Sequence, residues 1–227
     1  LLASALVAFG YREGPFPFAR RPFSWGLVGT VLRHRETRLA TFGYLGHMWE
    51  LYAMWTWIPA FLAASAAARG QGRWLVDVLS FGAIGTGALG CVWGGWYADR
   101  TSRERTVMIA LLASGFCAVT IGFALDRGPF MLAIMTAVWG FYVVADSAQF
   151  SALVTEVAPP HAVGTALTLQ TSLGFLLTLV TIQLVPQVAG AAGWTWAFPL
   201  LALGSAAGLA AIRRLARVRG VDPFHAS

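Results

Sequence analysis

Six long apolar stretches constrain this chain more than any other feature of its sequence. A bilayer core of ~30 Å is crossed by about 20 predominantly apolar residues, each rising ~1.5 Å along a helix, and all six stretches suit that length. Because backbone groups inside a bilayer find no water, continuous apolar segments of this kind are helices and not barrel strands. The sequence therefore predicts an all-α polytopic membrane protein with a bundle of six transmembrane helices. The predicted spans are 39–64, 75–97, 107–125, 129–150, 163–185 and 194–212.

The composition supports this reading. Hydrophobic residues make up 57% of the 227 residues, and charged residues only 11%, against about 25% in soluble domains. The formal charge of +6 would be compatible with nucleic-acid binding if the basic residues formed one patch. They are spread over the loops instead, so the prediction is a lipid bilayer as the partner and no nucleic acid.

The basic residues are all arginine, and they predict the orientation in the membrane. Basic residues are retained on the cytoplasmic side, and most of the arginines lie in the loops of one side. Only Arg69, Arg73 and Arg127 belong to the other side. Both ends of this segment are therefore expected in the cytoplasm of a cell (inner) membrane. The arginines on the predicted cytoplasmic side are Arg12, Arg20, Arg21, Arg33, Arg35, Arg38, Arg100, Arg103, Arg105, Arg213, Arg214, Arg217 and Arg219.

Four parts are expected along the chain. Residues 1–10 are apolar but too short to span a bilayer, and we interpret them as the end of a preceding transmembrane helix. A signal-peptide core is the alternative, but a basic n-region and a small-residue cleavage site are both missing. Residues 11–38 form a cytoplasmic linker with an amphipathic helix, residues 39–212 the six-helix domain, and residues 213–227 a cytoplasmic tail.

Glu50 and His47 are the polar residues that stand out inside the first span. Glu50 lies ~17 Å into that span, where a carboxylate costs ~2.5 kcal/mol or more on insertion scales. It must therefore face a water-filled cavity or a partner, or hold a proton. His47 is one helical turn earlier, and a histidine–glutamate pair can exchange protons near neutral pH. The alternative is a satisfied polar pair that only locks helices together.

Other polar residues are candidates for a substrate or proton pathway. Asp146 and Gln149 lie one turn apart near the cytoplasmic end of the fourth span, where Asp146 either lines the inner part of a cavity or is solvated at the interface. Gln170 in the fifth span hydrogen-bonds a substrate or a neighbouring helix. In the second span, glycine or threonine recurs every four residues over 82–94, which predicts a smooth face for close helix packing.

Metal and cofactor sites are not predicted. Cys91 and Cys117 fall in separate apolar runs without C-x-x-C spacing. His47 and Glu50 offer only two potential metal ligands, and a second pair is missing. The sequence also contains no lysine, so the glycines of the second span do not belong to a phosphate-binding loop.

The loop after the second span carries the most specific motif. It reads GGWYADRTSRER and matches G-x-x-x-D-R-x-x-R-x-R from Gly95 to Arg105. This resembles the loop signature of the major facilitator superfamily, which recurs after the second helix of each six-helix half. Two positions depart from the pattern, because Ser102 stands where glycine is usual and Glu104 where a basic residue is common.

A second loop extends the resemblance. The stretch TEVAPPHAVGTAL is similar to the loop between the fourth and fifth helices of a half, with Glu156, Pro159 and Gly164 in matching places. The resemblance implies the C-terminal half of a twelve-helix carrier, whose partner is a missing N-terminal six-helix half of the same chain.

The resemblance also implies roles for individual residues. In that family, residues like Asp99 meet the N-terminus of a neighbouring helix, and pairs like Arg103 with Glu156 latch the outward-open state. The first and fourth helices of a half border the cavity, which would put Glu50 at the midplane, between the halves. The implied gating residues are Gly95, Asp99, Arg100, Arg103 and Glu156.

We therefore expect a secondary active transporter that moves a small solute by alternating access and is coupled to protons. The predicted pathway residues are His47, Glu50, Asp146, Gln149 and Gln170. One alternative is a six-helix protein that acts as a homodimer or as a non-transporting sensor. An enzyme within the membrane is less favoured, because no nucleophile–base pair and no zinc motif occurs in the spans.

Overall fold

The computed structural model describes residues 2–11 and 24–221, and within them the regular structure is entirely helical. Two short helices come first, α1 (Leu2–Gly10) and α2 (Trp25–Arg33). Residues 222–227 of the tail and residues 12–23 of the predicted linker lie outside the described residues. The longer helices and the short segments that extend them are α3 (Arg35–Ala68), α4 (Arg73–Arg100), α5 (Arg103–Thr120), η1 (Ile121–Ala124), α6 (Pro129–Ala145), α7 (Ser147–Val157), α8 (Val163–Ala192), α9 (Trp194–Ala197), η2 (Pro199–Leu201) and α10 (Ala202–Arg219).

Six helical segments of the described chain are long and apolar enough to cross a membrane, so the predicted all-α bundle of six spans is confirmed. Each of them extends past at least one predicted end, and at Arg35, Arg100 and Arg219 the added turns carry arginine. The predicted span 39–64, for example, lies inside the segment Arg35–Ala68. The predicted tail is likewise partly helical, since α10 continues to Arg219.

Helix boundaries follow from local chemistry. Ser102 caps α5, and its hydroxyl accepts a hydrogen bond from the backbone N–H of Arg105 at 3.1 Å, as a serine N-cap does. Gly128 precedes α6 with φ 99°, a conformation that favours glycine. Pro129 follows as the first helical residue, where the missing N–H has no helical partner to lose.

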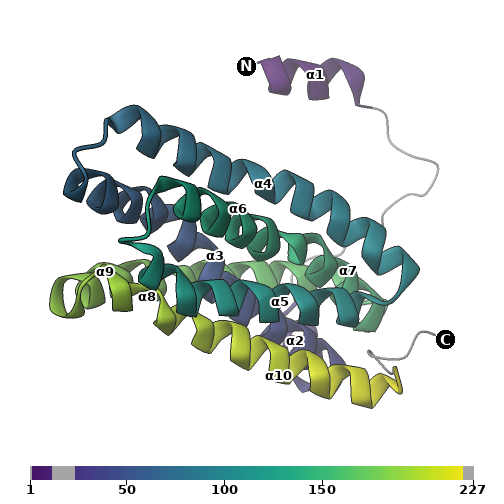
Figure 1. Cartoon of the computed structure of the whole chain (residues 1–227). Helices are drawn as coiled ribbons and strands as arrows, with labels where there is room; N and C mark the ends of the chain where they lie inside the picture. The colour runs from purple at the N-terminus through teal and green to yellow at the C-terminus, as the bar shows by residue number, and fades with distance from the viewer. Residues whose placement is uncertain (1, 12–23, 222–227) are drawn as a thin grey trace.

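Close backbone contact joins α4 to α6 (Figure 1). A side chain at Gly90 would meet the carbonyl of Phe141, and one at Gly94 the carbonyl of Ala145. The predicted small-residue face is thus present, but Gly82 is not on it, and Ala83 holds that position against Gly140. A spacing of four residues drifts away from the 3.6-residue turn, so a strict four-residue repeat leaves the contact face.

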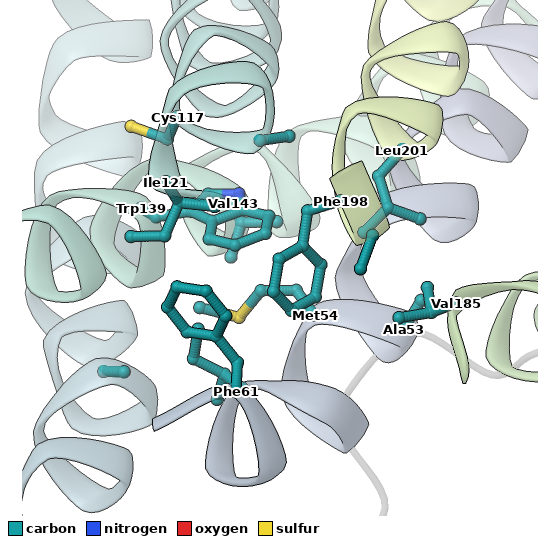
Figure 2. Close-up of a cluster of buried hydrophobic side chains, with 14 of the residues drawn as sticks. Ala53, Met54, Phe61, Cys117, Ile121, Trp139, Val143, Val185, Phe198 and Leu201 are labelled. Atoms are coloured by element: carbon teal, nitrogen blue, oxygen red, sulfur yellow. The ribbon is translucent and has the colours of Figure 1, made fainter. Parts of the chain in front are cut away.

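One end of the bundle is held by an apolar cluster (Figure 2). Figure 2 shows Phe61, Met54, Phe198 and Trp139 turned toward one another. The ring of Phe198 meets those of Phe61 and Trp139 edge-on, at centroid distances of 5.4 and 5.1 Å. Such edge-to-face pairs favour one fixed packing of the aromatic rings. This cluster joins α3 to α6 and to the segment before α10, and so fixes the helices that carry the buried polar residues.

Candidate functional site

His47 and Asp146 form a buried ion pair between the first and fourth spans. Nδ1 of His47 lies 2.9 Å from Oδ1 of Asp146, and both side chains are about 97% buried or more. The pair is close but is not aligned as a hydrogen bond. Asp146 is only 1% exposed, so the alternative that it is solvated at the interface is wrong.

Asp146 stands at an interruption of the fourth span. Helix α6 ends at Ala145 and α7 begins at Ser147, and Asp146 between them belongs to a turn. Oγ of Ser147 lies 3.1 Å from Nε2 of His47. Both ring nitrogens of His47 therefore have partners from the same turn, which fixes the orientation of the imidazole. The rings of Tyr44 and Phe150 pack beside it, at centroid distances of 6.0 and 5.4 Å.

Glu50 has a different environment. Its carboxylate accepts hydrogen bonds from the indole N–H of Trp139 at 2.6 Å, from the hydroxyl of Ser114 at 3.0 Å and from the hydroxyl of Ser205. These donors come from α6, α5 and α10, so one carboxylate joins three helices to α3. All are uncharged, and Glu50 is 1% exposed. The carboxylate thus points into this bundle and not toward a cavity at its surface.

The expected pair of His47 with Glu50 is not formed. Three residues along a helix bring side chains near one another but rotate them by about 60°, so that they can follow different neighbours. Here His47 turns to the fourth span at Asp146, while Glu50 turns to Ser114, Trp139 and Ser205. Within the described chain, the two residues share no hydrogen bond or ion pair.

Gln149 belongs to a second cluster, at the loop end of the bundle. Its amide oxygen accepts a hydrogen bond from Nη1 of Arg103 at 2.8 Å. Nε of Arg103 also donates to Glu156 at 2.5 Å, so the pair implied by the family resemblance is present. Gln149 is therefore placed with the loop residues and not with Asp146.

The loop-end cluster contains two more charged residues. Arg219, near the end of α10, lies 2.5 Å from Oε1 of Glu104 and 3.4 Å from Oε2 of Glu156. Glu104 is 2% exposed and sits in the first turn of α5, where the helix dipole favours a negative charge. Two arginines and two glutamates thus connect α5, α7 and α10.

The other residues of the loop motif lie outside this cluster of charged residues. Asp99 is exposed, and no hydrogen bond or ion pair joins it to another described residue. The guanidinium of Arg100 lies 4.2 Å from the ring centroid of Trp96. Gly95 has open space where a side chain would begin.

Gln170 is 1% exposed and lies one helical turn before Gly174, where an added side chain would meet Tyr44 and Met48 of α3. Its amide oxygen has no hydrogen-bond partner among the described residues. An unsatisfied buried acceptor is uncommon, and it leaves a position where a ligand hydroxyl or N–H could bond.

Several members of these clusters were not predicted from the sequence. Ser114, Trp139, Ser205 and Ser147 are uncharged residues of ordinary apolar spans, and nothing in their local sequence marks them as partners of a buried charge. Glu104 was visible as a departure from the loop motif, and its opposite charge to Arg219 was the available signal.

Comparison of the sequence with known protein families agrees with the six-helix fold. A family model described as "Sugar (and other) transporter" matches residues 40–214, which is most of the chain. This chain belongs to that family. The resemblance to the major facilitator superfamily, based on the two loops, is confirmed by this match. Together with the six apolar helices, it makes the chain part of a multi-pass membrane protein.

One relative of this chain is the gallate transporter of Pseudomonas putida, which is 33% identical to it over 82 residues. The match covers 36% of this chain and 18% of the relative, so the chain spans much less than two thirds of that transporter's length. Among the described residues of the chain, histidine, cysteine and acidic side chains form no group of three that would suit a metal ion.

Proposed function

We propose that this chain forms the C-terminal six-helix half of a secondary active transporter that moves a small organic solute by alternating access, coupled to protons. The family match supports transport. Alternating access in such folds is rocking of two six-helix halves around a midplane site. The partner half would come from the same polypeptide, and both ends of this segment would lie in the cytoplasm of the cell (inner) membrane.

The ion pair of His47 and Asp146 is the observation that carries the coupling proposal. Histidine is the side chain that most readily gains and loses a proton near neutral pH. An ionisable pair inside a membrane span is costly and is usually functional. This one connects the first span to a turn in the fourth, and those two helices border the cavity in the resembled fold. Gain or loss of a proton at His47 would change the attraction across that contact.

Glu50 has a supporting role in this proposal. Its three hydrogen bonds come from neutral donors that do not titrate near neutral pH, and the carboxylate joins four helices. We assign it to holding α3 in place, so that the position of His47 is fixed relative to Asp146. In this proposal His47, paired with Asp146, takes the coupling role that the sequence predicted for Glu50.

The loop-end cluster would act as the gate. Arg103 and Glu156 are about a third exposed, and exposed pairs of this kind contribute ~1 kcal/mol or less each. Such contacts can be broken and remade during a transport cycle. The additional pair of Arg219 with Glu104 would extend the latch to the last helix.

The proposed solute is a small organic acid of the kind that gallate represents, because a gallate transporter is among the relatives of this chain. The arginines of the described spans lie toward their ends, so the cationic partner of a carboxylate is expected from the other half. The unsatisfied amide oxygen of Gln170 would accept a hydrogen bond from a hydroxyl of the solute.

Uptake into proteoliposomes tests the function. The full-length protein that contains this sequence would be reconstituted, and radiolabelled gallate uptake would be measured with and without an imposed pH gradient, with a hexose as the comparison solute. We expect a pH gradient to accelerate gallate uptake and to leave the hexose signal at background. Equal gallate uptake with and without the gradient would contradict proton coupling, and uptake of neither solute would contradict the solute assignment.

A further inference from the structure

An apolar groove of about 580 Å³ runs along α3 and α10, away from the buried polar residues described above. Leu177 of α8 contributes to one side of it. A single charged side chain, that of Arg214, belongs to its wall. The lining residues are Leu39, Phe42, Leu45, Gly46, Trp49, Leu177, Leu203, Gly204, Ala207, Ala210, Ala211 and Arg214.

Small residues create the groove. The backbones of α3 and α10 touch at Gly46, whose missing side chain would meet the backbone of Gly204 and Gly208. Ala207 and Ala210 continue the small surface on α10. The larger side chains of Phe42 and Leu203 stand on the two rims, and they are 56% and 67% exposed.

The groove has the length of one lipid leaflet. On α3 it runs from Leu39 to Trp49, ten residues or about 15 Å along a helix. A bilayer core is ~30 Å thick, so half of it is about 15 Å. Trp49 closes the deep end, where its indole N–H donates to the carbonyl of Leu200 at 3.1 Å. A groove of this shape fits one extended acyl chain.

The shallow end of the groove is positively charged. Arg214 lines it, and Arg217 lies one turn farther along the same face of α10. On α3, Arg38 is one turn before Phe42 and is exposed, although it also donates to the carbonyl of Leu32 at 3.4 Å. The described acidic residues form no ion pair with Arg214, whereas Arg219 is held by two glutamates. Arginine at this position suits a phosphate group.

We propose that this groove binds one anionic glycerophospholipid, with an acyl chain between α3 and α10 and the phosphate at Arg214. A second protein segment would cover the apolar surface equally well, but it would need an acidic side chain placed at Arg214 to match the charge of the groove. The lipid satisfies both features, because its chain has the length of the groove and its headgroup has the opposite charge. Bound there, it would stabilise the contact of the first and last spans.

Lipid retention by the full-length protein tests whether Arg214 binds the phosphate of the lipid. The protein would be purified from bilayers of phosphatidylglycerol and phosphatidylcholine, and bound lipid would be measured by native mass spectrometry. Arg214→Gln is expected to lower retained phosphatidylglycerol about fivefold. Arg213→Gln is the matched control, because Arg213 is the adjacent exposed arginine and does not line the groove. Equal retention by the two variants would overturn the proposal.

Occupancy of the groove is tested separately. Ala207→Leu would fill it, whereas Ala206→Leu adds the same volume at an exposed position outside the lining. Only the first is expected to reduce lipid retention. A photocrosslinking phenylalanine analogue at Phe42 is expected to yield a phosphatidylglycerol adduct. The same analogue at Phe116, an exposed residue of α5, reports bulk lipid. A peptide adduct at Phe42, or the same lipid ratio at both positions, would contradict the proposal.

Discussion

Glu50 and Asp146 are both buried acidic residues in this bundle, yet their surroundings differ. Glu50 accepts hydrogen bonds from Ser114, Trp139 and Ser205, none of which is charged. Asp146 stands at a turn and is paired with His47, which can carry a proton. The comparison teaches that burial of an acid does not by itself identify a coupling site. Of these two contacts, only the one at Asp146 joins two ionisable side chains.

Removing the Glu50 carboxylate tests the first half of this comparison and should have the largest effect on stability. Glu50→Ala leaves three buried donors without an acceptor. We expect a loss of roughly 3 kcal/mol or more, because each buried donor left without a partner costs ~1–3 kcal/mol. The measurement is the free energy of unfolding in detergent. Glu50→Gln, which keeps the volume and an acceptor oxygen, should lose about half as much or less. An equal loss for both variants would show that the hydrogen bonds contribute little.

Removing one donor to Glu50 sharpens the comparison further. Trp139→Phe keeps an aromatic ring against Phe198 but deletes the N–H that bonds Glu50. The expected loss is ~1.5–3 kcal/mol, typical of a hydrogen bond to a charged group. Trp55→Phe is the matched control, since the N–H of Trp55 has no partner among the described residues. Little loss is expected for Trp55→Phe, and a similar loss in both variants would contradict a stabilising hydrogen bond from Trp139 to Glu50.

The smallest effect is expected at the other site. Ser147→Ala removes the hydroxyl beside Nε2 of His47 and should cost about 1 kcal/mol of stability. Because Ser147 fixes the orientation of the imidazole, the pH profile of uptake should shift although the protein remains folded. Ser151→Ala, at an exposed position of the same helix, should change neither quantity. If Ser147→Ala left the pH profile of uptake unchanged, Ser147 would have no role in proton coupling.

The fold could be predicted from the sequence because apolar length and arginine placement are local signals. Each span was visible in its own residues, and the loop motif from Gly95 to Arg105 identified the superfamily. The ends of the spans were less predictable, since charged turns such as the one at Arg219 continue a helix without any apolar signal.

The candidate site could be predicted only in part. Glu50 and His47 stood out because charge is rare in an apolar span, but their partners come from helices 64 to 155 residues away in the sequence. A serine such as Ser205 is frequent in membrane helices and gives no sign of bonding a carboxylate. The pairing of His47 with Asp146 in place of Glu50 depends on how the fourth span packs against the first. That packing is a property of the tertiary structure.

The most direct test of the central claim is solute uptake driven by a pH gradient, compared with solute exchange at equal pH. His47→Gln and Glu50→Gln would be measured in the same reconstituted full-length protein. The account predicts that His47→Gln loses at least about tenfold of the gradient-driven uptake, a change of ~1.4 kcal/mol, and retains exchange, while Glu50→Gln retains the pH response. If Glu50→Gln lost the pH response and His47→Gln kept it, Glu50 and not His47 would be the coupling residue.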